Sequence, residues 1–122
     1  SYSSDTRGLL ENILITLDMH KAEHITRIDL KGKSSLAETL VIASGTSSRH
    51  IQALAQHLYT HLKQHDFPIL GQDGGAGCDW IILDCGDVIV HLFTPEAREL
   101  YKLEDFWDTD VVKLIKSSSS KA

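Results

Sequence analysis

The chain of 122 residues has the length of one domain, and 42% hydrophobic with 24% charged residues is the composition of a folded globular protein rather than of a disordered one. No apolar run approaches the roughly 18 residues that a membrane span needs, so we expect no membrane segment. Two cysteines, Cys78 and Cys85, lack Cys-x-x-Cys spacing and favour a reducing compartment, so we expect a cytoplasmic protein without disulfides.

The net charge of −5 is unevenly distributed along the chain. Residues 66–110 contain eleven acidic residues against two basic ones, a net charge of −9, whereas residues 1–65 sum to +1 and residues 111–122 to +3. An acidic segment repels phosphate groups, so we expect no direct nucleic-acid binding there. It would attract a basic protein, although a solvated acidic face that maintains solubility explains the same charges about equally well.

The first half of the chain predicts a helix, two strands and a second helix. Apolar residues at three- and four-residue steps predict a helix over residues 5 to about 20, and alternation over 25–30 predicts a half-exposed strand. The run at the end of 36–43 is continuously apolar, which predicts an interior strand covered on both faces. After the turn-like residues 44–48, a second apolar stripe predicts a helix to about residue 64.

The second half predicts three further strands and a short helix. Residues 67–70 resemble a short strand whose proline places it at an edge or a strand start, and a glycine-rich loop follows over 72–77. Residues 79–83 and 88–93 predict a hairpin with its turn at 84–87. Thr94-Pro95-Glu96 is typical of a helix start, and residues 113–122, with four consecutive serines, predict a mobile tail.

Two places could in principle serve a nucleotide. The loop 45–48 precedes a helix and could hold a phosphate, but it lacks the glycine-rich phosphate-binding patterns, and capping of the helix by its serines and threonine is the simpler explanation. Asp79, Asp84 and Asp87 flank the hairpin and could hold magnesium. A working pair usually stands as Asp-x-Asp on one strand, so we favour a turn at 84–87 instead.

Histidines and nucleophiles give no stronger indication of chemistry. His57, His61 and His65 recur at four-residue steps and could share a metal, but no cysteine or carboxylate completes the ligand set, so a polar helix face that also includes His50 is favoured. His91 is interpreted as a surface or interface residue of its strand. No Ser-His-Asp or Cys-His arrangement can be assembled, and we therefore expect no catalytic residue, no metal and no cofactor.

Residues 98–107 contain three aromatic residues among charged ones, namely Tyr101, Phe106 and Trp107. Aromatic and arginine anchors inside a charged rim are a common arrangement of protein interfaces. Tyr101 and Trp107 could equally complete the hydrophobic core while the charges face water. The segment is the strongest candidate for an interaction surface.

Three blocks, residues 41–50, 79–93 and 96–107, resemble in order and spacing the ribosomal silencing factor, or iojap, family, over about residues 9–110. The resemblance implies an α/β fold akin to nucleotidyltransferases in residues 1–112, with a mixed sheet of about five strands flanked by helices and no catalytic carboxylates. It further implies a non-enzymatic protein that binds the fourteenth protein of the large ribosomal subunit. Joining of the small subunit would thereby be blocked, and translation repressed when nutrients are limiting.

The resemblance also implies which residues touch the partner. The family's tryptophan before a strand matches Trp80, and its Arg-x-x-Tyr-x-Leu-Glu-x-x-Trp pattern begins at Arg98. We expect the acidic residues to steer a basic partner and the large rings to supply buried contact. The expected partner-binding residues are Asp79, Trp80, Asp84, His91, Phe93, Arg98, Tyr101, Leu103, Glu104, Asp105 and Trp107.

Two other hypotheses remain open at this stage. The first is a nucleotidyltransferase-like, magnesium-dependent enzyme or nucleotide-binding protein that uses Ser47, Ser48 and the hairpin aspartates. The second is a homodimer whose acidic face is simply solvated. The loop 73–77 departs from the family, which usually carries a Glu-Gly pair there.

Overall fold

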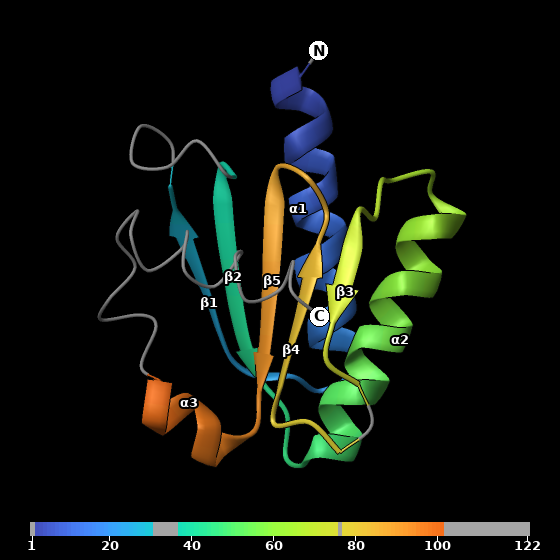
Figure 1. Ribbon diagram of the computed structural model, residues 1–122. Coiled ribbons are helices and arrows are strands. Elements are labelled where there is room, and N and C mark those ends of the chain that lie inside the picture. Colours follow the sequence, from blue (N-terminus) through green and yellow to red (C-terminus); the bar gives the residue numbers. More distant parts are fainter. Residues whose placement is uncertain (1, 31–36, 76, 102–122) are drawn as a thin grey trace.

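The computed structural model describes residues 2–30, 37–75 and 77–101 of the chain. Within them lie three helices and five strands (Figure 1). In chain order these are α1 (Tyr2–Met19), β1 (Glu23–Asp29), β2 (Thr39–Ser44), α2 (Ser48–Gln64), β3 (Gly71–Asp73), β4 (Trp80–Asp84), β5 (Val88–Phe93) and α3 (Pro95–Tyr101). Among these helices none has the length and apolar character needed to cross a membrane. The predicted tail at 113–122 lies outside the described residues.

The five strands form one mixed sheet in the order β1-β2-β5-β4-β3. β2 and β5 run parallel, and the other three neighbouring pairs are antiparallel. A parallel pair needs a long crossover, which here contains α2, β3 and β4. The predicted α/β class and the mixed sheet of about five strands flanked by helices are confirmed, as are the predicted hairpin β4–β5 and the interior position of β2.

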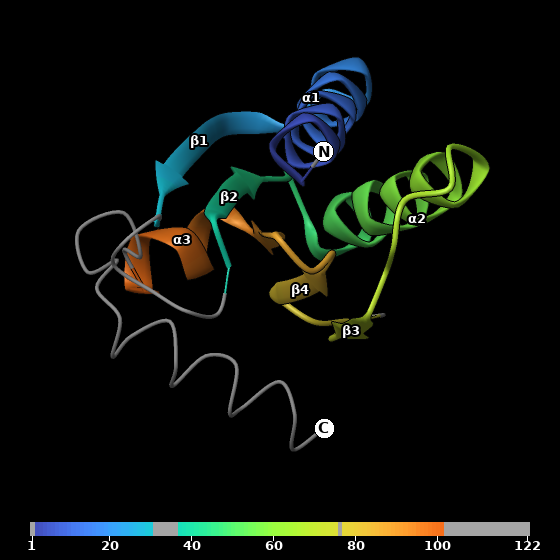
Figure 2. The same ribbon diagram turned by 90° about the horizontal axis from the view of Figure 1, so that it is seen from above.

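Helices α1 and α2 cover one face of the sheet (Figure 2). Strand residues alternate between faces, so the odd-numbered members of β2 and β4 point toward these two helices. The apolar stripe predicted for α2 packs there, with all five of its residues at most 2% exposed. We call this side the helix face, and its buried strand residues are Val41, Ala43, Ile81, Leu83, Val88, Val90 and Leu92.

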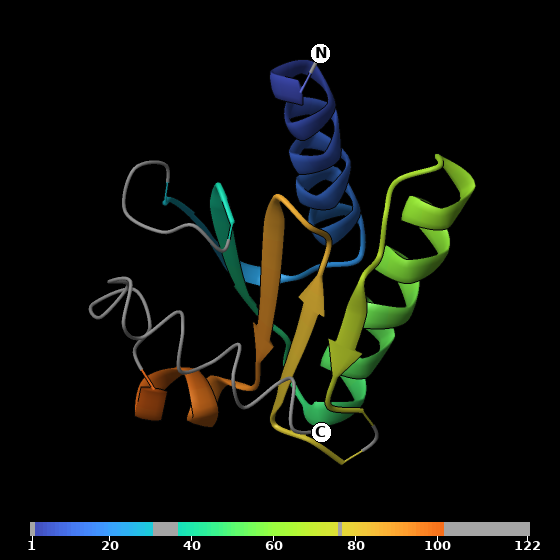
Figure 3. The same ribbon diagram turned by 45° about the horizontal axis from the view of Figure 1, so that its top comes forward.

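The opposite side of the sheet carries a second apolar cluster, which we call the α3 face. Its buried members are Ile28, Leu30, Ala37, Leu40, Ile42, Ile82, Ile89, Phe93 and Ala97, with Trp80 packed against them. Figures 1 and 3 show α3 at the end of the sheet where β2 and β5 both finish. Because parallel neighbours end at the same edge, β2, β5 and α3 bring distant parts of the chain together at this end.

The predicted strand at 67–70 is wrong. The third strand is Gly71–Asp73, and pairing with β4 is preceded by one bond, in which the Leu70 N–H donates to the Asp84 carbonyl at 2.8 Å. Pro68 has no N–H to donate, and the Phe67 N–H instead donates to Leu62 at the end of α2. Gly74 follows with a φ of 89°, where a Cβ would lie 2.6 Å from the Trp80 carbonyl oxygen, so a side chain there would collide with β4.

Candidate protein-interaction site

Three rings gather on the α3 face where β4 begins and β5 ends. Trp80 pairs with Phe93 in the β4–β5 register, and their ring centroids lie 4.9 Å apart. The ring of His91 lies 5.8 Å from Trp80 and 6.1 Å from Phe93. Trp80 is half-buried, whereas the other two side chains are buried. The structure thus brings three of the predicted site residues together and leaves Trp80 as the ring that reaches solvent.

The indole of Trp80 is held by His91. Its Nε1–H donates to His91 Nδ1 at 2.9 Å, which requires that Nδ1 carries no proton. The His91 side chain is only 2% exposed, and this burial lowers the pKa of His91 to about 3. Of the two alternatives for His91, a surface residue is therefore wrong, and its role in the interface stays a prediction. The neutral imidazole accepts the indole N–H and so orients the ring of Trp80.

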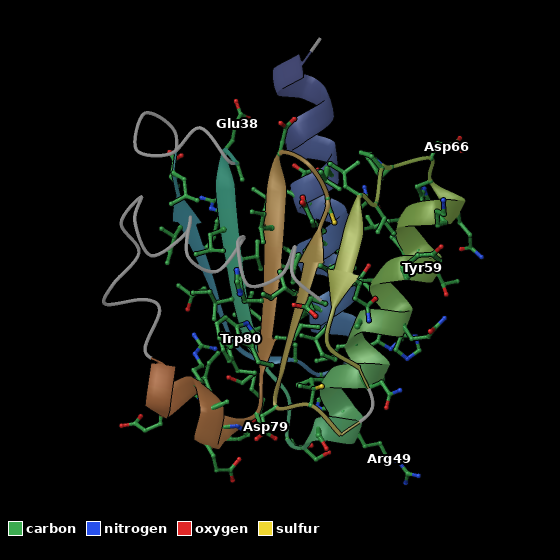
Figure 4. The ribbon with its side chains drawn as sticks, viewed as in Figure 1. Glu38, Arg49, Tyr59, Asp66, Asp79 and Trp80 are labelled. Carbon is green, nitrogen blue, oxygen red and sulfur yellow. The ribbon has the colours of Figure 1, made fainter. Side chains whose placement is uncertain are left out.

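Three exposed acidic residues lie at the same end of the sheet as this cluster. Asp79 is exposed and directly precedes β4, and its carbonyl accepts the Thr94 N–H at 3.0 Å, which ties the start of α3 to the start of β4. Glu96 and Glu99 are exposed on α3. Figure 4 shows Asp79 and Trp80 at this end of the sheet, on the opposite side from Tyr59 and Asp66. Together Trp80, Asp79, Glu96 and Glu99 form what we call the acidic-aromatic end.

Arg98 turns toward the sheet rather than away from it. Its guanidinium donates to Ser44 Oγ at 3.0 Å, to Thr26 Oγ1 at 2.9 Å and to the His24 carbonyl. These acceptors belong to β1 and β2, so one side chain of α3 binds two strands from the first half of the chain. The three acceptor residues were missed in the sequence, where nothing distinguishes them from ordinary strand residues.

Asp84 is not part of this cluster. It lies at the other end of β4 from Asp79, about 16 Å away for five strand residues at about 3.3 Å each. Its Oδ1 accepts the Gly86 N–H at 2.9 Å, and Gly86 has a φ of 86°, which is the predicted turn chemistry. Asp79 and Asp84 are therefore too far apart to bind one magnesium ion between them.

The loop before α2 uses its own hydrogen-bond donors. The Gly45 N–H donates to the Phe93 carbonyl and the Thr46 N–H to His50 Nδ1, both at 2.9 Å. Ser47 is the N-cap, with its Oγ accepting the His50 N–H at 3.1 Å. The predicted capping role is confirmed, and two of the amides that a phosphate would need are already bound within the protein.

The histidines of α2 make separate contacts and do not converge on one point. His57 stacks on His20 of α1 with centroids 3.6 Å apart, His61 Nε2 lies 2.7 Å from Asn12 Oδ1, and His61 and His65 are 4.4 Å apart. In the part of the chain that is described, no three histidine, cysteine or acidic residues are arranged to hold a metal ion. Desolvation, with the neighbouring His57 and His61, lowers the pKa of His20.

The two cysteines are free, and burial raises the pKa of Cys85 to about 12, so its thiol is not activated. The remaining predicted contact residues, Leu103, Glu104, Asp105 and Trp107, lie outside the described residues, as does the side chain of Tyr101. Their role stays a prediction.

Comparison with known proteins agrees with the resemblance of the three sequence blocks. Residues 3–122 match the family described as "ribosomal silencing factor during starvation". The ribosomal silencing factor of Haemophilus influenzae is 41% identical over 100 residues, covering 82% of this chain and 98% of that protein. A mouse protein named "mitochondrial assembly of ribosomal large subunit protein 1" is 34% identical over 101 residues, covering 80% of this chain and 44% of its own length.

Solved structures agree with the fold. A crystal structure of a Chromobacterium violaceum protein superposes with a TM-score of 0.80 at 30% identity, covering 83% of this chain and 84% of that one. The family match spans residues 3–122, which is nearly the whole chain. The chain belongs to the ribosomal silencing factor family.

Proposed function

We propose that this protein binds the large ribosomal subunit through its fourteenth protein and sterically blocks joining of the small subunit, which represses translation when nutrients are limiting. Membership of the family supports a ribosomal role, and the name of the mouse relative supports the large subunit in particular. The cytoplasm is the expected compartment, and no catalytic step is required.

The observation that carries the proposal is the acidic-aromatic end. Trp80 presents a partly exposed ring fixed by His91, and Asp79, Glu96 and Glu99 are exposed acidic residues at the same end of the sheet. A rigid aromatic side chain supplies contact area at a low cost in entropy, and surrounding acidic groups attract a basic ribosomal protein. Part of the unevenly distributed negative charge therefore lies at the end of the sheet that contains this ring.

Co-sedimentation with separated ribosomal subunits tests the proposal. We expect binding to large subunits and not to small ones, with weaker binding at high salt because exposed charges are screened. Trp80→Ala should reduce binding by roughly ten-fold or more, as expected for an interface hot spot. The matched control is Tyr59→Ala, an exposed aromatic on α2, on the other side of the molecule, which should bind like the unchanged protein.

Charge reversal gives a second variant that does not disturb packing. Asp79→Lys should weaken binding and Glu11→Lys, on exposed α1 surface, should not. Subunit joining should be inhibited in the same rank order, measured as the yield of joined ribosomes in a sucrose gradient. Preference for the small subunit, or equal binding by Trp80→Ala and the unchanged protein, would contradict the proposal.

The nucleotidyltransferase alternative gains no observation from the site. Asp79 stands at the opposite end of β4 from Asp84 and Asp87, the Asp84 carboxylate accepts a turn N–H, and Ser47 is used as a cap. Thermal unfolding with magnesium and each nucleotide separates the hypotheses, because a ligand selective for the native state must raise the melting temperature. We expect no shift.

A further inference from the structure

The guanidinium of Arg98 occupies a socket made by an irregularity in β1. Between Glu23↔Ser44 and Thr26↔Ile42, β1 advances by three residues while β2 advances by two, so β1 contains one extra residue. This is a β-bulge, which locally breaks the ladder and re-aims the groups beside it. His24 lies within it with a φ of 49°, a conformation that non-glycine residues rarely adopt.

The bulge produces the acceptors that Arg98 needs. The carbonyl of His24 accepts a hydrogen bond from the Arg98 Nη1 group, and Thr26 Oγ1 and Ser44 Oγ lie within reach of the same guanidinium. Ser44 is only 2% exposed, so its hydroxyl has little access to water. Hydrogen bonds from a charged donor are stronger than neutral ones, and the planar fork of arginine suits several acceptors at once.

These contacts fasten the middle of α3, whose start is fastened separately. The Thr94 N–H is bound to Asp79, and Thr94 Oγ1 caps the helix by accepting the Ala97 N–H at 3.4 Å. Among the α3 side chains that the structure describes, only Ala97 belongs to the apolar cluster. A seven-residue helix is not stable by itself, so its position depends on such attachments.

We propose that Arg98 is a positioning residue: it clamps α3 onto the bulge of β1 and so sets the place of Glu96, Glu99 and the end of the helix relative to Trp80, without itself contacting the ribosomal partner. The binding part of this inference rests on the proposed function, whereas the clamp itself does not. It reassigns a residue that the family pattern would otherwise place in the interface.

Amide hydrogen exchange tests the clamp in the isolated protein. Arg98→Ala should speed exchange of the α3 amides by roughly ten-fold or more, while β5 amides keep their protection. Arg98→Lys should be intermediate, because one ammonium group cannot reproduce the fork. The matched control is Arg27→Ala, an exposed arginine of the same strand as the bulge, with no expected effect. Unchanged α3 exchange in Arg98→Ala would overturn the clamp.

Binding to large subunits then separates positioning from contact. Thr26→Val combined with Ser44→Ala removes two acceptors and leaves Arg98 in place. If Arg98 acts as a clamp, this double variant weakens binding in the same direction as Arg98→Ala, and combining all three changes adds little beyond Arg98→Ala alone. If Arg98 contacts the partner, the double variant binds normally while Arg98→Ala does not, and the inference fails.

The two readouts fail independently. Should the unchanged protein not bind large subunits at all, the proposed function is lost, but the exchange of α3 still decides whether the clamp exists. Should Arg98→Ala not fold, the Thr26 and Ser44 double variant carries both measurements, because it alters only two hydroxyl groups.

Discussion

The two faces of the sheet are both buried, but by different kinds of side chain. On the helix face two long helices cover an apolar cluster, and the buried hydroxyl of Thr16 bonds within its own helix, to the Asn12 carbonyl. On the α3 face the aliphatic side chains share the surface with Trp80, His91 and the Arg98 socket, each of which depends on directed hydrogen bonds. Apolar packing is non-directional, whereas these bonds fix orientations. The comparison assigns stability to the first face and placement of the interaction site to the second.

A cavity on the helix face should have the largest effect on stability. Leu58 of α2 is fully buried in that cluster. Leu58→Ala should lower the free energy of unfolding by about 2–5 kcal/mol, measured by denaturant titration, because it removes apolar contacts and leaves a void. Binding to large subunits per folded molecule should not change. A loss below about 2 kcal/mol, the lower end of that range, would contradict the assignment of stability to this face.

The α3 face should make the stability of the protein depend on pH, because it contains the buried His91. His91 stays neutral in the native state because burial lowers its pKa to about 3, whereas the unfolded chain binds a proton near pH 6.5. The unfolded state therefore holds more protons below pH 6.5, and stability falls as the pH is lowered from there toward 3, by up to about 1.4 kcal/mol per pH unit for this group. The lowered pKa of His20 acts in the same direction.

The contribution of His91 to the pH dependence of stability is obtained by comparing the unchanged protein with a variant that does not titrate at this position. His91→Gln offers the Trp80 indole an amide oxygen as acceptor and does not titrate. The stability of this variant, measured by denaturant titration between pH 7 and pH 4, should fall less steeply than that of the unchanged protein. Parallel curves would show that His91 is accessible to protons, contrary to its burial.

Removing the indole N–H of Trp80 should lower the free energy of unfolding by less than the cavity at Leu58. Trp80→Phe keeps a ring beside Phe93 but leaves His91 Nδ1 buried without a donor, at a cost of about 1–3 kcal/mol. Adding His91→Leu removes the acceptor as well, and the double variant should recover part of that loss. Denaturant titration of the two single variants and the double variant gives the coupling energy, and additive losses would argue against the bond.

Sequence patterns predicted the helix face better than the α3 face. Three- and four-residue steps found both long helices, and continuous apolar runs found β2, because hydrophobic burial leaves a periodic signal. The third strand was misplaced, since the apolar residues at 67–70 outweighed the loss of a donor at Pro68. The hairpin turn was predicted because aspartate and glycine suit its backbone angles, whereas Trp80 was singled out through the resemblance to the family.

The hydrogen-bond acceptors of Arg98 could not be predicted from the sequence. Its acceptors are a carbonyl, a serine and a threonine that are separated from Arg98 by 54 to 74 positions, and a bulge is created by strand register rather than by residue type. The burial of His91 was missed for a related reason: it follows from the packing of Trp80 and Phe93 around the imidazole, which the residues of its own strand do not reveal.

The smallest stability effect, and the most selective one on binding, is expected at Asp79. Its side chain is exposed, and its structural role uses the backbone carbonyl, which Asp79→Asn retains. Unfolding should change by less than about 0.5 kcal/mol. Binding to large subunits should weaken at low salt and approach that of the unchanged protein at high salt, because only a steering charge is lost.

The matched control for this charge is Asp66→Asn. Asp66 is exposed after α2, away from Trp80, and its φ of 60° is tolerated by asparagine as well as by aspartate. Both variants change the net charge by one, so a general effect of charge would weaken both equally. A selective effect of Asp79→Asn would localise the electrostatic attraction to the acidic-aromatic end, where α3 and β4 begin side by side, because the two variants differ only in where the charge was removed.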